Sequence, residues 1–225
     1  MNLLDFNVIK ISEESMRSLE DRKWVDDQMI AISLDIKQNE VNKTTDKVLF
    51  VSPSTTQLIR KSKDNTDIKE TIKDLKIYEK DWVFYPVSNN DQVSKPGGGT
   101  HWSLLVYCKL KDVYYHHDPI NPMNGMHAAE LIKKIASVDN RFSHFQMDVK
   151  CPQQNNGYDC GPYIMLFANK MADNLVKGVE PNFYEVSKDE ATRYRKELRD
   201  KIQTEMKKAS EEMEKKNKNG TKPLR

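Results

Sequence analysis

One cysteine constrains this chain more than any other residue. Cys160 stands between Asp159 and Gly161, directly before an apolar run over residues 163–167. The run predicts a buried helix that begins at Cys160, where the positive end of the helix favours a thiolate. The thiolate is the nucleophilic form of cysteine, so the pattern indicates a catalytic thiol. The alternative is a buried structural cysteine, because free cysteines are among the most buried residues.

Two segments upstream of this cysteine predict a β-hairpin that would supply a general base. The strand over residues 101–107 follows a glycine-rich loop and begins at His101, and the strand over residues 113–118 ends at Asp118, before a proline. The linker between them is short and polar, so the strands pair antiparallel and His101 lies near Asp118. Asp118 would then orient the His101 ring while the ring takes the thiol proton. A surface histidine, and an aspartate that only caps a turn, are the alternatives.

No metal or cofactor site is expected from the remaining histidines and cysteines. His116 and His117 precede Asp118, but neighbouring residues of a strand point to opposite faces of the sheet. The chain has no C-x-x-C or H-x-x-x-H pair, which are spacings typical of zinc sites. Cys108 and Cys151 are therefore interpreted as bystanders.

The length and charge of the chain favour one domain with a well-solvated surface. A chain of 225 residues can bury a substantial core without disulfides. We expect a single α+β domain over residues 1–213, ending in a long charged helix, and a disordered basic tail over residues 214–225. The net charge is +2, from 36 basic and 34 acidic residues, which gives no reason to expect a nucleic-acid partner.

The compartment is predicted from what the sequence does not contain. The first residues lack the basic start and apolar run of a secretory signal, and no segment is apolar for long enough to span a membrane. The three cysteines cannot all pair with one another. We therefore expect a reducing compartment, the cytoplasm or the nucleus, and no membrane contact.

Hydrophobic periodicity predicts alternating helices and strands around the hairpin. The loop over residues 88–99, which is rich in Asn, Asp, Pro and Gly, could move over a bound partner or be an ordinary surface loop. Besides the hairpin, we expect strands over residues 48–51, 82–87 and 142–149, and helices over residues 13–19, 27–36, 55–61, 68–75, 128–136, 163–174 and 187–213.

The ordered residues resemble the Ulp/sentrin-specific family of cysteine proteases over roughly residues 8–175. His101, Asp118 and Cys160 follow one another as in that family, with Gln154 six residues before the cysteine. The run over residues 98–107, GGTHWSLLVY, is closer to the deneddylase branch than to the SUMO-protease branches. Residues 24–27, WVDD, are similar to the family's Trp-Leu-Asn-Asp motif and depart from it at the two middle positions.

The resemblance implies a papain-like α+β fold of the Ulp type, with a central mixed sheet flanked by helices. It implies a monomeric protease that cleaves after the C-terminal Gly-Gly of a ubiquitin-like modifier, both in precursors and in conjugates such as modified cullins. The neddylation modifier is the substrate that this branch implies, with SUMO as the alternative. A module that binds the modifier without catalysis is a second class of function, and acetyl transfer a third. The complete set of His101, Asp118 and Cys160 favours the protease.

The resemblance also implies roles for four more residues. Gln154 would donate its side-chain amide to the developing oxyanion, although it could be one more polar loop residue. Trp24 and Trp102 would form the walls of a channel that only glycine can thread, whereas core packing is the usual state of a tryptophan. Asp27 would bind an arginine upstream of the Gly-Gly, and it could also act as a carboxylate at a helix N-terminus.

Overall fold

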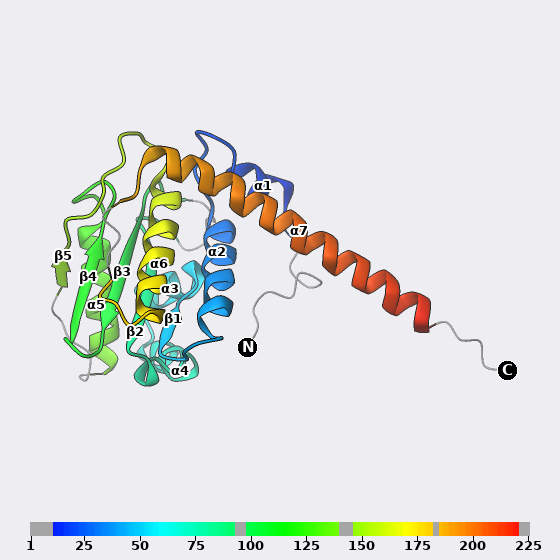
Figure 1. Ribbon diagram of the computed structural model, residues 1–225. Coiled ribbons are helices and arrows are strands. Elements are labelled where there is room, and N and C mark those ends of the chain that lie inside the picture. Colours follow the sequence, from blue (N-terminus) through cyan, green and yellow to red (C-terminus); the bar gives the residue numbers. More distant parts are fainter. Residues whose placement is uncertain (1–10, 93–97, 140–145, 182–184, 221–225) are drawn as a thin grey trace.

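The fold is built on one mixed, five-stranded sheet (Figure 1). The computed structural model describes residues 11–92, 98–139, 146–181 and 185–220. β2, β3 and β4 pair antiparallel, whereas each outer strand is parallel to its neighbour, so the predicted α+β class and mixed sheet are confirmed. The strands, in their order across the sheet, are β1 (Val48–Phe50), β2 (Trp82–Ser88), β3 (Trp102–Cys108), β4 (Val113–His117) and β5 (Gln146–Asp148).

Helices cover both faces of this sheet (Figure 1). The first face carries α2 and α6, with α1 and α7 packed against them, and the second face carries α3, α4, the short 3-10 helix η1 and α5. The helices are α1 (Glu13–Ser18), α2 (Asp27–Val41), α3 (Pro53–Lys61), α4 (Asn65–Asp74), η1 (Ile77–Glu79), α5 (Gly125–Val138), α6 (Cys160–Val176) and α7 (Lys188–Gly220).

The central strand β3 contributes to both cores. All of its residues are buried. Leu104 and Val106 pack into the core beneath α6, and Leu105 and Tyr107 pack into the core beneath α5. This alternation follows from the period of two along a strand, and burial on both faces explains why β3 is apolar throughout.

Helix α6 begins at Cys160, as the sequence predicts. Eleven of its 17 residues are buried, which is expected of a helix that is apolar nearly all round. Its first turn lies against the segment before α2, because a Cβ atom added at Gly161 would come within 2.8 Å of the Cβ of Val25. Gly161 therefore allows the start of the helix to approach Val25 closely.

The predicted hairpin is formed by β3 and β4. The register pairs Leu104 with His117, so His101 lies opposite the residues that follow His117. The connecting turn uses Asp112 in the left-handed region at φ +48°, and its side chain accepts a hydrogen bond from the hydroxyl of Tyr107 at 2.9 Å. The hairpin thus brings the two ends that carry His101 and Asp118 together.

The loop before His101 is held at its first residues. Arg60 of α3 is buried, and its guanidinium donates to the backbone carbonyl of Asn90 and to Oδ1 of Asp91 at 3.0 Å. The same side chain donates to Oε2 of Glu130 on α5 at 2.6 Å. Residues 93–97 of the loop that was expected to move lie outside the described residues, as do residues 142–145 of the strand predicted over 142–149.

Helix α7 differs most from the prediction. Its N-terminal half packs on the domain through four buried residues, and its C-terminal half projects past it (Figure 1). We expected disorder from residue 214, but the helix continues to Gly220. Lys and Glu are good helix formers and residues 188–220 contain no proline, so the stretch extends the helix. Among the described helices, none is long and apolar enough to cross a membrane.

Candidate active site

His101 and Asp118 form a buried hydrogen-bonded pair at the end of the hairpin. The Nε2–H of His101 donates to Oδ1 of Asp118 at 2.6 Å, and both side chains are at most 2% exposed. The predicted adjacency of the two residues is therefore confirmed. Nδ1 of His101 is buried as well, with no nitrogen or oxygen partner within the described residues.

Backbone groups fix the Asp118 carboxylate. The N–H of Ile120 donates to Oδ1 at 2.9 Å, and the N–H of Asn124 donates to Oδ2 at 2.7 Å. Burial alone would raise the pKa of Asp118, but the hydrogen bonds from His101 and from these two N–H groups lower it below its usual range. The carboxylate is thus ionised beside His101, and it caps the following turn as well.

Three amide side chains hold the backbone of this pair. Oδ1 of Asn89 accepts the N–H of His101 at 3.1 Å. Nδ2 of Asn124 donates to a carbonyl of β2 at 2.9 Å and to the carbonyl of His101 at 3.5 Å. Nε2 of Gln153 donates to the carbonyl of Asp118 at 2.8 Å. These contacts join the ends of β2, β3 and β4 to the loop that leads to Cys160.

Cys160 lies beside His101 and is 3% exposed. Burial would lower the pKa of His101, but the hydrogen bond to Asp118 and the interaction with Cys160 outweigh it and raise this pKa to about 9. An imidazolium at neutral pH stabilises a neighbouring thiolate. The position of Cys160 at the first residue of α6 acts in the same direction, because helix N-termini favour negative charge.

The two neighbouring histidines have lowered pKa values. Burial lowers the pKa of His116, although its Nδ1 bonds to Asp148 at 3.0 Å, and its Nε2 bonds to Ser103 at 2.9 Å. Burial lowers the pKa of His117 to about 3, and its ring packs near that of Phe167. Of these three histidines, only His101 has a pKa raised above its ordinary value.

A narrow cavity leads to Cys160 between two tryptophans, and we call it the tryptophan channel. Its volume is about 110 Å³. Trp102 is 8% exposed and its Nε1–H donates to the carbonyl of Val25 at 3.2 Å, whereas Trp24 is 55% exposed and its Nε1–H donates to the carbonyl of Gly157 at 2.7 Å. The channel is lined by Trp24, Val25, Asp26, Asp27, Ser88, Gly99, Thr100, Trp102 and Cys160.

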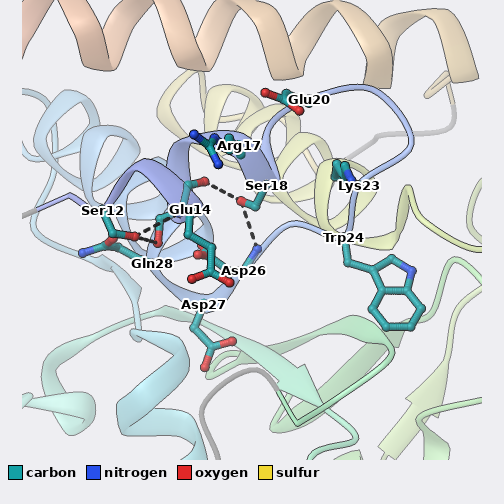
Figure 2. A pocket seen from close by; sticks show the side chains of 11 residues that line it. Ser12, Glu14, Arg17, Ser18, Glu20, Lys23, Trp24, Asp26, Asp27 and Gln28 are labelled. Atoms are coloured by element: carbon teal, nitrogen blue, oxygen red, sulfur yellow. Dashed lines mark hydrogen bonds between the residues drawn. The ribbon is translucent and has the colours of Figure 1, made fainter.

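A larger cavity of about 680 Å³, the acidic groove, adjoins the channel. The two share Trp24, Asp26 and Asp27, and Figure 2 shows the side chains of Trp24 and Asp27 both directed away from α1 toward the sheet. Burial, and then the neighbouring Asp26 charge, raise the pKa of Asp27. The groove carries four carboxylates and two basic groups; its lining is Ser12, Glu14, Ser15, Arg17, Ser18, Glu20, Lys23, Trp24, Asp26, Asp27 and Gln28.

Gln154 points into the loop before Cys160. Its Nε2 donates to the carbonyl of Asn156 at 2.6 Å, which uses one of its two N–H groups. Its backbone N–H donates to the carbonyl of Pro119 at 2.9 Å, next to Asp118. Gln154 therefore lies between the Asp118 turn and the nucleophile loop, with one amide N–H left for another acceptor.

Within the described residues, no group of three or more His, Cys, Asp or Glu side chains could hold a metal ion.

Cys151 is buried, and its thiol donates to the carbonyl of Asp118 at 3.3 Å. Burial raises the pKa of this thiol to about 12, so Cys151 stays protonated at neutral pH.

The sequence that forms this site matches a known protein family. The model of the Ulp1 protease family, C-terminal catalytic domain, matches residues 8–210. The chain belongs to the Ulp1 protease family. It is therefore a cysteine peptidase with the protease fold predicted from the motif order.

Curated relatives of this Ulp1-family protease have related names. The chain is 28% identical to the probable sentrin-specific protease 8 of Dictyostelium discoideum over 197 residues, 83% of this chain and 81% of that protein. It is also 28% identical to the sentrin-specific protease 8 of Homo sapiens over 170 residues (74% and 79% coverage), and to the NEDD8-specific protease 1 of Arabidopsis thaliana over 177 residues (78% and 77%).

Solved structures agree with the family assignment at the level of the fold. The SUMO protease Ulp1 with its catalytic cysteine oxidized to a sulfinic acid is similar, with a TM-score of 0.66 and 20% identity, covering 88% of this chain and 85% of that one. The complex of the Ulp1 protease domain with Smt3, the yeast ortholog of SUMO, gives a TM-score of 0.63 at 21% identity, covering 86% and 83%.

Sequence reasoning missed several residues of this Ulp1-family site. Asn124 precedes a helix, which is a signal for a capping residue, but nothing in its position indicates contact with Asp118. Gln153 bonds the Asp118 carbonyl, and no local signal separates it from the neighbouring Gln154. Arg195 of α7 binds Asp159, next to Cys160, through a contact that spans 36 residues of sequence.

Proposed function

We propose that this protease releases the neddylation modifier, acting after its C-terminal Gly-Gly in conjugates and in the precursor. One observation carries the proposal: the His101–Asp118 pair stands beside Cys160, and a narrow channel between two tryptophans leads to that thiol. Cys160 is the nucleophile, His101 the general base and acid, and Asp118 the carboxylate that orients the ring.

The chemistry follows from these positions. The Cys160 thiolate attacks the carbonyl carbon of the terminal glycine, and the oxyanion that forms accepts hydrogen bonds from the backbone N–H of Cys160 and the free amide N–H of Gln154. The bond to the leaving amine then breaks as the His101 imidazolium gives that amine its proton, which leaves a thioester. A water molecule gives its proton to His101 and hydrolyses the thioester, which releases the modifier and regenerates the Cys160 thiolate beside the His101 imidazolium.

The tryptophan channel supports selection of Gly-Gly. A glycine pair has no side chains to recognise, so a tight passage discriminates by excluding larger residues. A cavity of about 110 Å³ between Trp24 and Trp102 admits a bare backbone in this way. Asp27, whose pKa is raised by burial and by Asp26, lies where the channel meets the acidic groove and is proposed to bind an arginine upstream of the glycines.

The choice of modifier rests on the curated relatives. A relative of similar length is named a NEDD8-specific protease, and others are named sentrin-specific protease 8. We further propose that the enzyme acts as a monomer on conjugates such as modified cullins, in the cytoplasm or the nucleus. The three cysteines are free, which supports a reducing compartment.

The proposal is tested with probes that carry an electrophile at the C-terminus of the neddylation modifier, SUMO or ubiquitin. We expect a covalent adduct with the neddylation probe and none in Cys160→Ala. Cys108→Ala is the matched control, since Cys108 is equally buried but lies at the far end of β3, and it should react like the wild type.

A SUMO adduct in place of the neddylation adduct would keep the mechanism and overturn the proposed modifier. Binding of the modifier with no adduct from any probe would favour the non-catalytic module. An adduct that persists in Cys160→Ala would remove Cys160 as the nucleophile.

A further inference from the structure

Arg195 of α7 makes the most extensive set of buried polar contacts near Cys160. The side chain is 2% exposed, and all five of its N–H groups can be accounted for by bonds to four acceptors. Nε and Nη2 donate to Oδ1 of Asp159 at 3.2 and 2.9 Å, and Nη2 also donates to the carbonyl of Tyr158 at 2.8 Å. Nη1 donates to the carbonyls of Ser18 and Glu20 at 3.1 and 3.2 Å.

These contacts join two segments that form the site. Tyr158 and Asp159 are the two residues before Cys160. Ser18 and Glu20 belong to the end of α1 and the turn that leads to Trp24, the outer wall of the channel. One guanidinium therefore fixes the nucleophile loop relative to the channel wall.

The Asp159 carboxylate does not cap helix α6, although an aspartate directly before a helix usually does. It is the residue before the first turn of α6, where aspartate normally accepts an N–H of that turn. Asp26 before α2 and Asp64 before α4 make this bond, to the N–H of Met29 at 2.9 Å and of Thr66 at 2.7 Å. Asp159 makes no capping bond.

Two features account for this: Pro162, which corresponds to Met29 in α2, has no N–H, and both carboxylate oxygens have other partners. Oδ1 is held by Arg195, and Oδ2 accepts from Nδ2 of Asn156 at 2.7 Å. The N–H groups at the start of a helix have no partner within the helix. The N–H of Cys160 is not a capping target for the residue directly before it, and with Asp159 turned away the N–H of Gly161 stays open as well.

We infer that Arg195 is a positioning residue for the nucleophile: it holds the Asp159 carboxylate away from the first turn of α6, so that this turn serves the thiolate and the oxyanion. Without Arg195, the carboxylate turns to the N–H of Gly161, as Asp64 turns to the N–H of Thr66 two residues after it. A negative charge then stands next to the thiolate. The inference rests on the proposed role of Cys160.

The other charged groups around Cys160 form no described hydrogen bond or ion pair with Arg195. His101, with Asp118 behind it, faces the sulfur from the hairpin. Asp26 and Asp27 face the channel from the start of α2, and the Asp26 carboxylate is engaged with its own helix. A difference between the wild type and an Arg195 variant therefore reports on Asp159.

The test is the pH dependence of Cys160 alkylation by iodoacetamide in the intact protein. An uncompensated carboxylate nearby raises a thiol's pKa by about one unit, so Arg195→Met should react about tenfold more slowly at pH 6. At high pH, where the thiolate is fully formed, the rates should agree within about twofold. Replacing the carboxylate as well, in Arg195→Met/Asp159→Asn, should return the titration to that of the wild type.

Arg199→Met is the matched control, one turn further along α7. Arg199 donates to the carbonyl of Met16 at 3.1 Å and to Oε1 of Glu20 at 3.5 Å, and neither contact involves Asp159, so its loss should leave the titration unchanged. Arg195→Gln, which keeps an amide donor without the charge, serves if Arg195→Met does not fold, and the same upward shift is expected.

A wild-type titration in folded Arg195→Met or Arg195→Gln overturns the inference, because a purely structural role would leave the thiol unaltered. A shift that Asp159→Asn does not reverse overturns it too, since the carboxylate would then not be the cause. Failure of the proposed function looks different: Cys160→Ala would keep full cleavage activity, whatever the Arg195 variants do.

Discussion

The catalytic pair and the outer wall of the channel are built in opposite ways. His101 and Asp118 are at most 2% exposed and are bonded on several sides, whereas Trp24 is 55% exposed and is held by one hydrogen bond to Gly157. Groups that must keep a geometry to a fraction of an ångström benefit from a rigid surrounding. Trp24, which would contact the C-terminal segment of the modifier as it enters, lies at the surface. The difference predicts that changes in the pair act on catalysis, and changes in the wall on substrate binding.

The largest effect should come from Asp118→Asn. An amide cannot stabilise the His101 imidazolium as a carboxylate does, so we expect kcat/KM to fall about 10³-fold or more. Asp148→Asn is the matched control, because Asp148 bonds His116 in the same sheet and should leave kcat/KM nearly unchanged. Equal losses in both variants would mean that carboxylates of this sheet matter only for folding.

The next largest effect is expected from Gly161→Ala, because the added methyl group lies where α6 meets Val25 of the channel. The added methyl would come within 2.8 Å of Val25, so we expect the free energy of unfolding to fall by about 1–3 kcal/mol. Displacement of Val25, which accepts the Trp102 hydrogen bond, should lower kcat/KM about 10²-fold. Chemical denaturation and steady-state kinetics measure both.

Gly157→Ala is its control, because a Cβ there meets nothing within 4 Å. Val25→Ala placed in Gly161→Ala should recover part of the activity by making room for the methyl. If Gly157→Ala is equally damaging, the close approach of Gly161 to Val25 is not the cause.

The pH profile should show the charged state of the rigid pair. The folded pKa of His101, about 9, lies above its ordinary value of 6.5, so the imidazolium's contribution to stability is full below pH 6.5 and is lost as pH rises through about 9. We expect kcat/KM to fall about tenfold per pH unit above that pKa. In Asp118→Asn the alkaline limb should move to lower pH; a limb unchanged in that variant would contradict the assignment to His101.

The smallest effect is expected at the outer wall. Trp24→Ala should raise KM by roughly tenfold with little change in kcat, which corresponds to about 1.4 kcal/mol of binding. Its stability should change by less than about 0.5 kcal/mol, because the side chain is mostly exposed. Trp102→Ala is the comparison: its buried ring should cost about 3–5 kcal/mol of stability. Equal stability losses in the two variants would remove the contrast between the regions.

The sequence predicted elements whose causes are local. The apolar run after Cys160 predicted helix α6 and its first residue, and the short polar linker predicted the hairpin that pairs His101 with Asp118. The predicted end of α2 at residue 36 was too early, since the helix continues to Val41 through polar residues that are good helix formers. The disorder expected from residue 214 was wrong as well, since α7 continues to Gly220. A stretch with low apolar content still forms a helix when its charged residues are good helix formers.

Contacts between distant segments could not be predicted in this way. Asn89, Asn124 and Gln153 meet the catalytic pair because three strand ends and a loop converge there. Nothing in a row of charged residues distinguishes Arg195, which is buried, from Arg199 one turn later, which is partly exposed. The packing of α7 on the nucleophile loop decides which of the two reaches Asp159.

By itself, the sequence determined the fold class, the order of the motif and the pairing of His101 with Asp118, because periodicity, short linkers and helix starts depend on neighbouring residues. The tertiary structure alone decided how exposed each tryptophan is, where the Gln154 amide points and that Arg195 binds Asp159. These features depend on which surfaces are brought together when the helices pack on the sheet, and a buried guanidinium is stable only where the folded chain gathers enough acceptors around it.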